Sequence, residues 1–429
     1  MAELREVSLT DRIEATPVVA TGHRWLCAQE DKPEAVESYF LMYPESRADP
    51  ERASFGSVTD PVPPFSPGGG LIPVLLKMDD GRLACLTRTG APHVGTGSEV
   101  SISFSEDRGA SWSDYRLVAR GEPDDQLDYR DHSLGQASDG TLVVVYGLLF
   151  GEVEASREDD PDPRARREEH LEVVRSTDGG ATWSEPTLID MPGRGIFVRP
   201  HGQMVRLADG TLVFMARGHQ SDEIHEADPS AHERVNFLYR STDGGLTWEE
   251  PTEIRSGWSE TGFLPLTEDR WVAYVRHNHQ PNWLAWSQDG GRTWPRWEEG
   301  CLSTGTPPER LANLRRPGHW RMVNGKPQKP SPGSVTRLAN GIVLITYGYR
   351  AYPFGVRAIV SRDGGEHFDL ETEYVISDRA FSWDCGYPST VCYDDGLVVT
   401  TAYSLMDLDH PDWGTCCLAY RYSQDLFAA

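Results

Sequence analysis

The chain contains 429 residues, with 41 Lys and Arg against 66 Asp and Glu, which gives a formal net charge of −25. This charge argues against nucleic acid or an anionic membrane surface as a partner. The sequence contains no run of about 18 apolar residues, so no transmembrane helix is expected. The seven cysteines lack metal-like spacing and the first residues lack a signal-peptide pattern. We therefore expect a cytoplasmic protein with reduced thiols, although a secreted chain without its leader would have the same sequence.

Six short polar turns recur along the chain, each between two apolar segments that alternate as β-strands do. Asp-Gly and Asn-Gly at such places are strong signals for tight hairpins, whereas the Glu-Asp of the fourth turn is a weaker one. The pattern predicts six antiparallel hairpins. In chain order their turns are Asp80-Gly81, Asp139-Gly140, Asp209-Gly210, Glu268-Asp269, Asn340-Gly341 and Asp395-Gly396.

Five of the hairpins are followed by the phrase Ser-x-Asp-x-Gly-x-x-Trp. The Ser and Asp side chains can bond backbone N–H groups of a turn, and the Gly allows a positive φ. The Trp can pack between neighbouring sheets. The five copies begin at Ser105, Ser176, Ser241, Ser287 and Ser361, the last ends in Phe368 instead of Trp, and Ser423-Gln-Asp425 is a degenerate sixth.

One hairpin and one phrase-bearing hairpin together give four antiparallel strands, which is the content of one propeller blade. Six such units predict an all-β, six-bladed β-propeller that forms a single domain over residues 1–429. The last blade must be closed, because an open sheet edge would be left otherwise. We expect the N-terminal segment 1–69 to help, through Pro17-Val-Val-Ala20 or Arg24-Trp-Leu-Cys27 pairing with the strands around 415–422.

Arg, His, Tyr and carboxylate residues recur where the chain enters or leaves the inner hairpins, positions that converge at one mouth of a propeller. Several guanidiniums in one pocket repel each other unless they bind an anion, so the pattern predicts a substrate with a carboxylate or sulfate. The alternative is that these arginines pair with nearby Asp and Glu. In chain order the candidates are Arg88, His93, Arg130, Asp131, Arg199, His201, Arg217, Glu260, Arg276, His277, Arg350 and Tyr387.

The repeated phrase resembles the Asp box, or BNR repeat, of the sialidase (neuraminidase) superfamily, and the resemblance extends from about Gly70 to the C-terminus. It implies a six-bladed fold and a set of site roles. Glu260 and Arg276 match the family's glutamate and the second arginine of its carboxylate-binding triad, and Tyr387 matches its nucleophile. A Tyr hydroxyl, with an ordinary pKa of about 10, needs a base, and Glu260 is the expected one.

Two departures from the family are visible. Leu71 stands where the family has the arginine of an Arg-Ile-Pro phrase, and Tyr403-Ser404 stands where it has the glutamate that supports this arginine. The third triad arginine is Arg350 or Arg357. No Asp matches the family's acid after Arg88, so His93 or Asp131 is the acid candidate. Sialidase-like propellers with His-centred sites include rhamnosidases that act on uronate-containing glycans and polysaccharide lyases.

These features predict a glycoside hydrolase that releases a terminal acidic sugar, divergent from true sialidases. Tyr387 is the expected nucleophile or charge stabiliser, Glu260 its base, and Arg276 with Arg88 or Arg350 the substrate clamp. One alternative is a lyase on uronates that uses Tyr, His and Arg, and another is a non-catalytic glycan-binding propeller. We predict no metal and no cofactor, a carbohydrate partner, and neither nucleic acid nor membrane; the sequence is compatible with a homo-oligomer.

Overall fold

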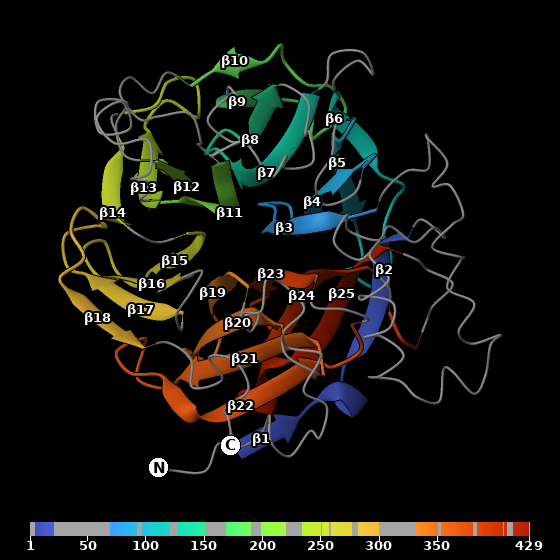
Figure 1. The fold of residues 1–429 in the computed structure, drawn as a ribbon, viewed down its shortest axis with the longest axis vertical. Helices are drawn as coiled ribbons and strands as arrows, with labels where there is room; N and C mark the ends of the chain where they lie inside the picture. Colours follow the sequence, from blue (N-terminus) through green and yellow to red (C-terminus); the bar gives the residue numbers. More distant parts are fainter. Residues whose placement is uncertain are drawn as a thin grey trace, which may run out of the picture.

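The structure, a computed structural model, describes residues 5–20, 69–91, 97–120, 127–150, 169–189, 199–219, 234–249, 251–256, 259–276, 282–299, 331–350, 353–380, 384–405, 407–409 and 415–428. These residues form strands and two short 3-10 helices, η1 (Thr10–Arg12) and η5 (Gln424–Phe427), without an α-helix. Within these ranges no helix has the length and apolarity needed to cross a membrane. The sheets lie around a common centre (Figure 1), so the prediction of an all-β, propeller-like fold is confirmed.

The first half of the chain forms a four-stranded sheet and an eight-stranded one. The eight-stranded sheet consists of two antiparallel groups, β7 to β10 and β11 to β14, which a short parallel pairing of β7 with β11 joins. The strands of the first sheet are β3 (Leu71–Lys77), β4 (Leu83–Thr89), β5 (Glu99–Ser105) and β6 (Arg116–Arg120). Those of the second are β7 (Leu127–Gln136), β8 (Leu142–Phe150), β9 (Glu169–Ser176), β10 (Thr187–Leu188), β11 (Arg199–Arg206), β12 (Leu212–His219), β13 (Arg234–Ser241) and β14 (Thr252–Ser256).

The second half forms three sheets. One is β15 (Thr261–Pro265), β16 (Trp271–Val275), β17 (Trp283–Ser287) and β18 (Arg296–Glu299). The next is β19 (Gly333–Arg337), β20 (Val343–Tyr349), β21 (Gly355–Ser361) and β22 (Asp369–Ser377), to which β1 (Arg5–Ser8) adds a parallel edge strand. The last is β23 (Cys385–Cys392), β24 (Leu397–Ser404) and β25 (Cys416–Ser423), completed by β2 (Glu14–Ala20).

The N-terminal strand β2 pairs antiparallel with the C-terminal strand β25, with Thr16 opposite Ala419 and Ala20 opposite Cys416. This is the pairing that the sequence suggested for Pro17-Val-Val-Ala20, whereas Arg24-Trp-Leu-Cys27 lies outside the described residues. The pairing gives β25 a partner on its outer side. A sheet made of both ends of the chain leaves fewer unpaired backbone groups at its edge.

The innermost strands β3, β7, β11, β15, β19 and β23 lie nearest the centre in Figure 1, and each contacts the next, with β23 returning to β3. Side chains also connect them. The Gln203 amide on β11 donates to the carbonyl of Leu75 on β3 at 2.8 Å and to that of Thr390 on β23 at 3.0 Å. The centre is therefore held by hydrogen bonds between strands that are far apart in the sequence.

The second strand of each inner hairpin carries the strongest apolar pattern. Strand β16 reads Trp-Val-Ala-Tyr-Val, and all five residues are buried. Strands β4 and β20 are buried along their whole length as well. These strands lie inside their sheets and face a neighbouring sheet on both sides, so both alternating sets of side chains must be apolar or paired.

The six predicted hairpins and the five repeated phrases form as expected. Each phrase is a turn between the third and fourth strands of a unit, and the copy at β13 is representative. Ser241 Oγ donates to Asp243 Oδ1 at 2.8 Å and accepts from the N–H of Gly245 at 2.8 Å. Gly245 has a φ of 83°. Burial would raise the pKa of Asp243, but hydrogen bonds from Thr247 and Ser241 outweigh it and lower the pKa to about 2.

The aromatic residue at the end of each phrase fills the interface with the preceding sheet or strand group. Trp248 packs against a cluster formed by β8, β9, β11, β12 and β13. The rings of Trp248 and of Phe214 on β12 meet edge-on, with 4.7 Å between the ring centres. In the degenerate sixth copy Ser423 still accepts a bond from the N–H of Asp425. Phe427 is fully buried there, beside Tyr374 and Tyr422. A buried aromatic ring is thus retained although the phrase itself is lost.

Two adjacent glycines of the third phrase allow a matched test. A Cβ on Gly245 would lie 2.7 Å from Cγ1 of the buried Val143, whereas a Cβ on Gly244 would meet nothing closer than 3.5 Å; both residues have positive φ. We expect Gly244→Ala to lower the free energy of unfolding by about 1–2 kcal/mol through backbone strain. Gly245→Ala should cost about 1–3 kcal/mol more because the buried neighbour cannot move aside. Urea unfolding of both variants measures the difference, and equal losses would contradict it.

Candidate active site

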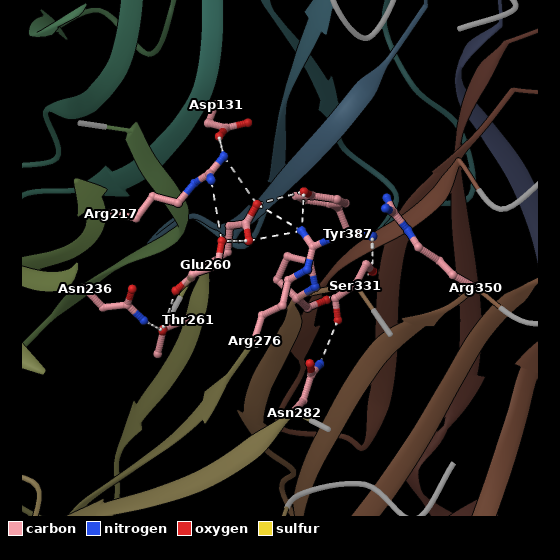
Figure 2. Close-up of polar contacts among 12 residues, drawn as sticks. Asp131, Arg217, Asn236, Glu260, Thr261, Arg276, Asn282, Ser331, Arg350 and Tyr387 are labelled. Atoms are coloured by element: carbon pink, nitrogen blue, oxygen red, sulfur yellow. Dashed lines mark hydrogen bonds and ion pairs between the residues drawn. The ribbon is translucent and has the colours of Figure 1, made fainter. Parts of the chain in front are cut away.

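A cluster of polar side chains gathers where the inner strands of several sheets begin or end (Figure 2). Glu260 precedes β15 and Arg276 follows β16, so the antiparallel hairpin brings the two to the same edge. Tyr387 lies near the start of β23, Asp131 within β7 and Arg217 near the end of β12. Residues in or next to five strands, from four separate regions of the chain, therefore contribute to one site.

Tyr387 and Asp131 owe their direction to β-bulges. The pairing register shifts between Gly386 and Ser389 and again between Arg130 and His132. Tyr387 has a φ of 51° and Asp131 a φ of 41°, a left-handed conformation that non-glycine residues rarely adopt. The N–H of Tyr387 donates to Ser331 Oγ at 3.2 Å. Bulges re-aim side chains, and strain of this kind is characteristic of functional sites.

Tyr387, Glu260 and Arg276 make direct contact. The Tyr387 hydroxyl donates to Glu260 Oε1 at 2.9 Å. Arg276 Nη1 donates to both carboxylate oxygens at 3.1 Å and to Tyr387 Oη at 3.0 Å. Ser259 Oγ donates to the other oxygen, Oε2. The predicted nucleophile, base and arginine thus lie within hydrogen-bond distance of one another.

Arg217 connects this group with Asp131. Its Nη2 lies 3.1 Å from Asp131 Oδ2 and 3.4 Å from Glu260 Oε1. Burial would raise the pKa of Asp131, but Arg217 and Arg199 outweigh it and lower the pKa. Asp131 is therefore an ionised acceptor near neutral pH. The contact with Arg217 favours the charged form of Asp131, which is unfavourable for the expected role of Asp131 as the proton donor.

The site holds Glu260 ionised and Tyr387 neutral. Burial would raise the pKa of Glu260, but Arg217 and Arg276 outweigh it and hold the pKa well below its usual value. Burial, followed by the negative charge of Glu260, raises the pKa of Tyr387 to about 12. A neutral phenol therefore faces a carboxylate across a short hydrogen bond.

Arg350 supports Tyr387 from the opposite side. Its guanidinium carbon lies 5.5 Å from the centre of the Tyr387 ring, while Nη2 donates to Tyr403 Oη at 3.2 Å. Tyr403 in turn donates to Asp384 Oδ1 at 2.6 Å. Arg357 lies elsewhere and bonds the carbonyls of Ser377 and Pro353. Of the two arginines that the sequence left open, Arg350 is the neighbour of Tyr387.

Asp384 and Tyr403 belong to this site although they are outside the predicted set. Asp384 directly precedes β23 and Tyr403 lies near the end of β24, so the hairpin pairing places both at the same edge as Tyr387. That register is the signal by which the sequence could have identified them. Leu71, in the position of the absent arginine, packs with Ile72, Tyr387, Tyr403 and Leu405. This position therefore makes an apolar contact with the site.

Arg88 and Arg130 form a different cluster. Arg88 is fully buried, and it bonds Asp128 Oδ1 at 2.7 Å and the carbonyls of Tyr129 and Ala91. Arg130 bonds the second oxygen of the same Asp128. These contacts contradict the expected role of Arg88 as a substrate clamp, since its guanidinium is enclosed by protein. The alternative reading, arginines paired with nearby carboxylates, holds for this pair.

Three further candidates from the sequence are Arg199, His93 and His277. Arg199 begins β11 directly opposite Arg217 on β12, and its charge acts on both Asp131 and Arg130. His93 and His277 lie outside the described residues. Among the residues that the structure describes, no group of three or more His, Cys, Asp or Glu side chains could hold a metal ion.

His201 lies edge-on to Tyr387, with 5.6 Å between the ring centres. It is buried, and its Nδ1 has no hydrogen-bond partner among the described residues. Burial lowers the pKa of His201 to about 4, so the imidazole is neutral at pH 7. His201 and Tyr387 line a cavity of about 20 Å³, which holds roughly one water molecule.

His201 and His132 give stability a pH dependence. Burial lowers the pKa of each from 6.5 to about 4. Between these values the unfolded chain binds more protons than the folded one, so stability falls as the pH drops from about 6.5 to about 4. We expect a loss of up to about 3 kcal/mol per histidine. Urea unfolding at several pH values across this range gives the free energy of unfolding as a function of pH. This free energy should fall less steeply with decreasing pH in His132→Gln than in the unchanged protein, and equal pH dependence in the two would contradict the assignment.

The fold and the site together define a propeller-like protein with a Tyr–Glu–Arg cluster at the ends of its inner strands. Residues 133–400, more than half of the chain, match the family described as the BNR repeat-like domain. The chain belongs to this family, as a divergent, sialidase-like member.

Among curated proteins, a sialidase of Bacteroides fragilis is 26% identical over 213 residues, which cover 47% of this chain and 38% of the sialidase. The match thus spans well under half of that protein.

Solved structures share the fold at low identity. A Dyadobacter fermentans protein of unknown function has a TM-score of 0.62 and 22% identity, over 82% of this chain and 94% of its own. Trypanosoma rangeli sialidase in complex with sialic acid has a TM-score of 0.58 and 15% identity, over 84% of this chain and 55% of its own. The microbial sialidase Hz136 has a TM-score of 0.56 at 20% identity, over 83% and 66% of the two chains.

Proposed function

We propose that this protein is a glycoside hydrolase that removes a terminal acidic sugar from a glycan or oligosaccharide. The proposal includes a six-bladed ring, in which the two antiparallel groups of the eight-stranded sheet count as separate blades. It also treats the whole chain as one domain. The observation that carries the proposal is the hydrogen bond of Tyr387 Oη to Glu260 Oε1 at 2.9 Å, with Arg276 Nη1 3.0 Å from the same hydroxyl.

The chemistry follows from these contacts. Tyr387 Oη attacks the anomeric carbon, its proton passes to Glu260, and the glycosidic C–O bond breaks toward the leaving oxygen. That oxygen needs a proton from an acid, and His93 is the remaining candidate. Water then hydrolyses the glycosyl–tyrosine intermediate, with Glu260 returning the proton to Tyr387 Oη.

A neutral nucleophile suits an acidic substrate. A carboxylate nucleophile would be repelled by an anionic group next to the reacting carbon, whereas a phenol is uncharged until it reacts. Arg276 is only partly covered, with 16% of its side chain exposed, and it can meet a carboxylate or sulfate that enters the site. The relative and the structural neighbour named as sialidases support the choice of an acidic sugar.

Elimination on a uronate is the second candidate, and the geometry of His201 favours it. A neutral imidazole with an unpartnered Nδ1 beside Tyr387 can take a proton, and Tyr387 can donate one to the leaving oxygen. An arginine would then neutralise the carboxylate next to the carbon that loses its proton. The product of this reaction contains a new C=C bond.

One screen separates these reactions. Aryl glycosides and glycan fragments, acidic and neutral, are incubated with the protein and the products are weighed by mass spectrometry. Hydrolysis adds one water across the broken bond, and elimination adds none and creates ultraviolet absorption. We expect water addition on acidic substrates. Elimination would replace the proposal with the second candidate, and binding without any cleavage would indicate a glycan-binding propeller.

A further inference from the structure

Glu260 lies behind the arginines that hold it. Its side chain is 2% exposed, compared with 14% for Arg217 and 16% for Arg276. A molecule that enters the site therefore meets the guanidiniums before it meets the carboxylate. The charged and titratable groups around Glu260 come from four other strands and from its own hairpin: Asp131 on β7, His201 on β11, Arg217 on β12, Tyr387 on β23 and Arg276 after β16.

The contacts of these arginines leave capacity for another anion. Arg276 reaches both oxygens of Glu260 through the single nitrogen Nη1 at 3.1 Å, instead of the paired contact of two nitrogens with two oxygens. Arg217 divides its Nη2 between Asp131 and Glu260. In both arginines Nε is buried without a hydrogen-bond partner among the described residues. Because these nitrogens are buried, the arginine side chains must turn toward an entering anion before two of its oxygens can form the stronger paired contact.

The same contacts make Glu260 a weak base. Its carboxylate receives bonds from Ser259, Tyr387 and Arg276, so its lone pairs are already occupied. Burial would raise the pKa of Glu260, but the two arginines hold it well below its usual value. Because the pKa of Tyr387 is about 12, moving the phenol proton to Glu260 is strongly uphill.

We propose that the anionic group of the substrate activates the Tyr387–Glu260 pair by drawing Arg276 and Arg217 away from the Glu260 carboxylate. This inference rests on the proposed function, since it assigns the acidic group a role in the chemical step. With the guanidiniums turned to the substrate anion, Glu260 regains its affinity for a proton. The proton of Tyr387 Oη then passes to Glu260 Oε1 as Oη forms its bond to the anomeric carbon.

In this proposal the acidic group of the substrate contributes to catalysis and not only to binding. A neutral analogue that occupies the site leaves Glu260 held by both arginines. Loss of the acidic group should therefore lower kcat even at saturating substrate, whereas loss of a group used only for binding would change KM alone. The site would thus discriminate between acidic and neutral sugars in the chemical step.

Inorganic sulfate tests the release of Glu260 without any sugar. Sulfate is titrated into the protein by calorimetry at about pH 5, in two buffers whose ionisation enthalpies differ, which gives the number of protons taken up. We expect net proton uptake, and an affinity that rises as the pH falls, by at most tenfold per pH unit for one coupled proton. Glu260→Gln should lose most of the uptake, while Glu298→Gln, at an exposed ion pair on β18, should keep it.

Carbon NMR of the glutamate carboxyl groups gives a second measurement on the unchanged protein, in case Glu260→Gln does not fold. One glutamate carboxyl group should titrate below the ordinary range, and its pKa should rise by about one unit or more when sulfate is added. Equal proton uptake in the unchanged protein and in Glu260→Gln would overturn the proposal. Failure of sulfate to bind, or a titration that sulfate does not move, would overturn it as well.

Kinetics separate this proposal from the proposed function. An acidic aryl glycoside that the enzyme cleaves is compared with the analogue that lacks the acidic group. We expect a loss in kcat of at least about tenfold, with partial recovery when acetate is added to the neutral analogue. A change in KM alone would overturn the activation while leaving the hydrolase assignment intact. If no glycoside is cleaved at all, the proposed function fails, and the sulfate titration still decides whether an anion releases Glu260.

Discussion

Tyr387→Phe is expected to lower kcat on an acidic aryl glycoside by about a thousandfold or more, because the variant lacks the hydroxyl oxygen that attacks the anomeric carbon. Glu260→Gln should lower kcat by about 10²–10⁴-fold, since the phenol of Tyr387 then has no proton acceptor. The two side chains share one hydrogen bond of 2.9 Å. The double variant should therefore be no slower than Tyr387→Phe alone, because groups that act as a unit are not additive.

Steady-state kinetics of the three variants checks this, with Tyr115→Phe as the control. Tyr115 is 38% exposed and lies away from the site cluster, so its loss should leave kcat unchanged. The unfolding midpoint of each variant is measured in parallel, to separate loss of activity from loss of structure. Full activity in Tyr387→Phe would refute its role as nucleophile, and multiplicative losses in the double variant would refute the shared proton path.

Arg88→Met is expected to lower the free energy of unfolding by about 3–5 kcal/mol, because it leaves the buried carboxylate of Asp128 with one of its two arginines removed. Arg88 is fully buried and Asp128 is 1% exposed. Burial would raise the pKa of Asp128, but Arg88 and Arg130 outweigh it and lower the pKa. The stability that this pair supplies is present above the ordinary pKa of an Asp and is lost as the pH falls below it.

Arg276→Met provides the contrast. Its side chain is partly exposed and bonds Glu260 and Tyr387, so we expect a large loss of activity and a smaller loss of stability. Urea unfolding and kcat/KM are measured for both variants. If Arg88→Met raised KM without loss of stability, Arg88 would be a substrate clamp after all and the structural assignment would be wrong.

The sequence by itself determined the turns and, through them, the fold. Ser241, Asp243 and Gly245 lie within five positions, and they supply the hydrogen bonds of the serine hydroxyl and one positive φ of the turn. Such local chemistry is readable from neighbouring residues. Repetition of the turn between apolar strands sets the register of the hairpins, and this register places Glu260, Arg276 and Tyr387 at one edge of the sheets.

The tertiary structure decided which of the charged candidates face the site and in what state. Arg88 and Arg276 end equivalent strands, yet one is enclosed with Asp128 and the other meets Tyr387. Asp131 is a carboxylate because Arg217, 86 positions away, lies against it. Burial and the charge of distant neighbours fix these properties, and neither is written in the local sequence, so the scaffold could be predicted from the chain while the chemistry of the site required its three-dimensional contacts.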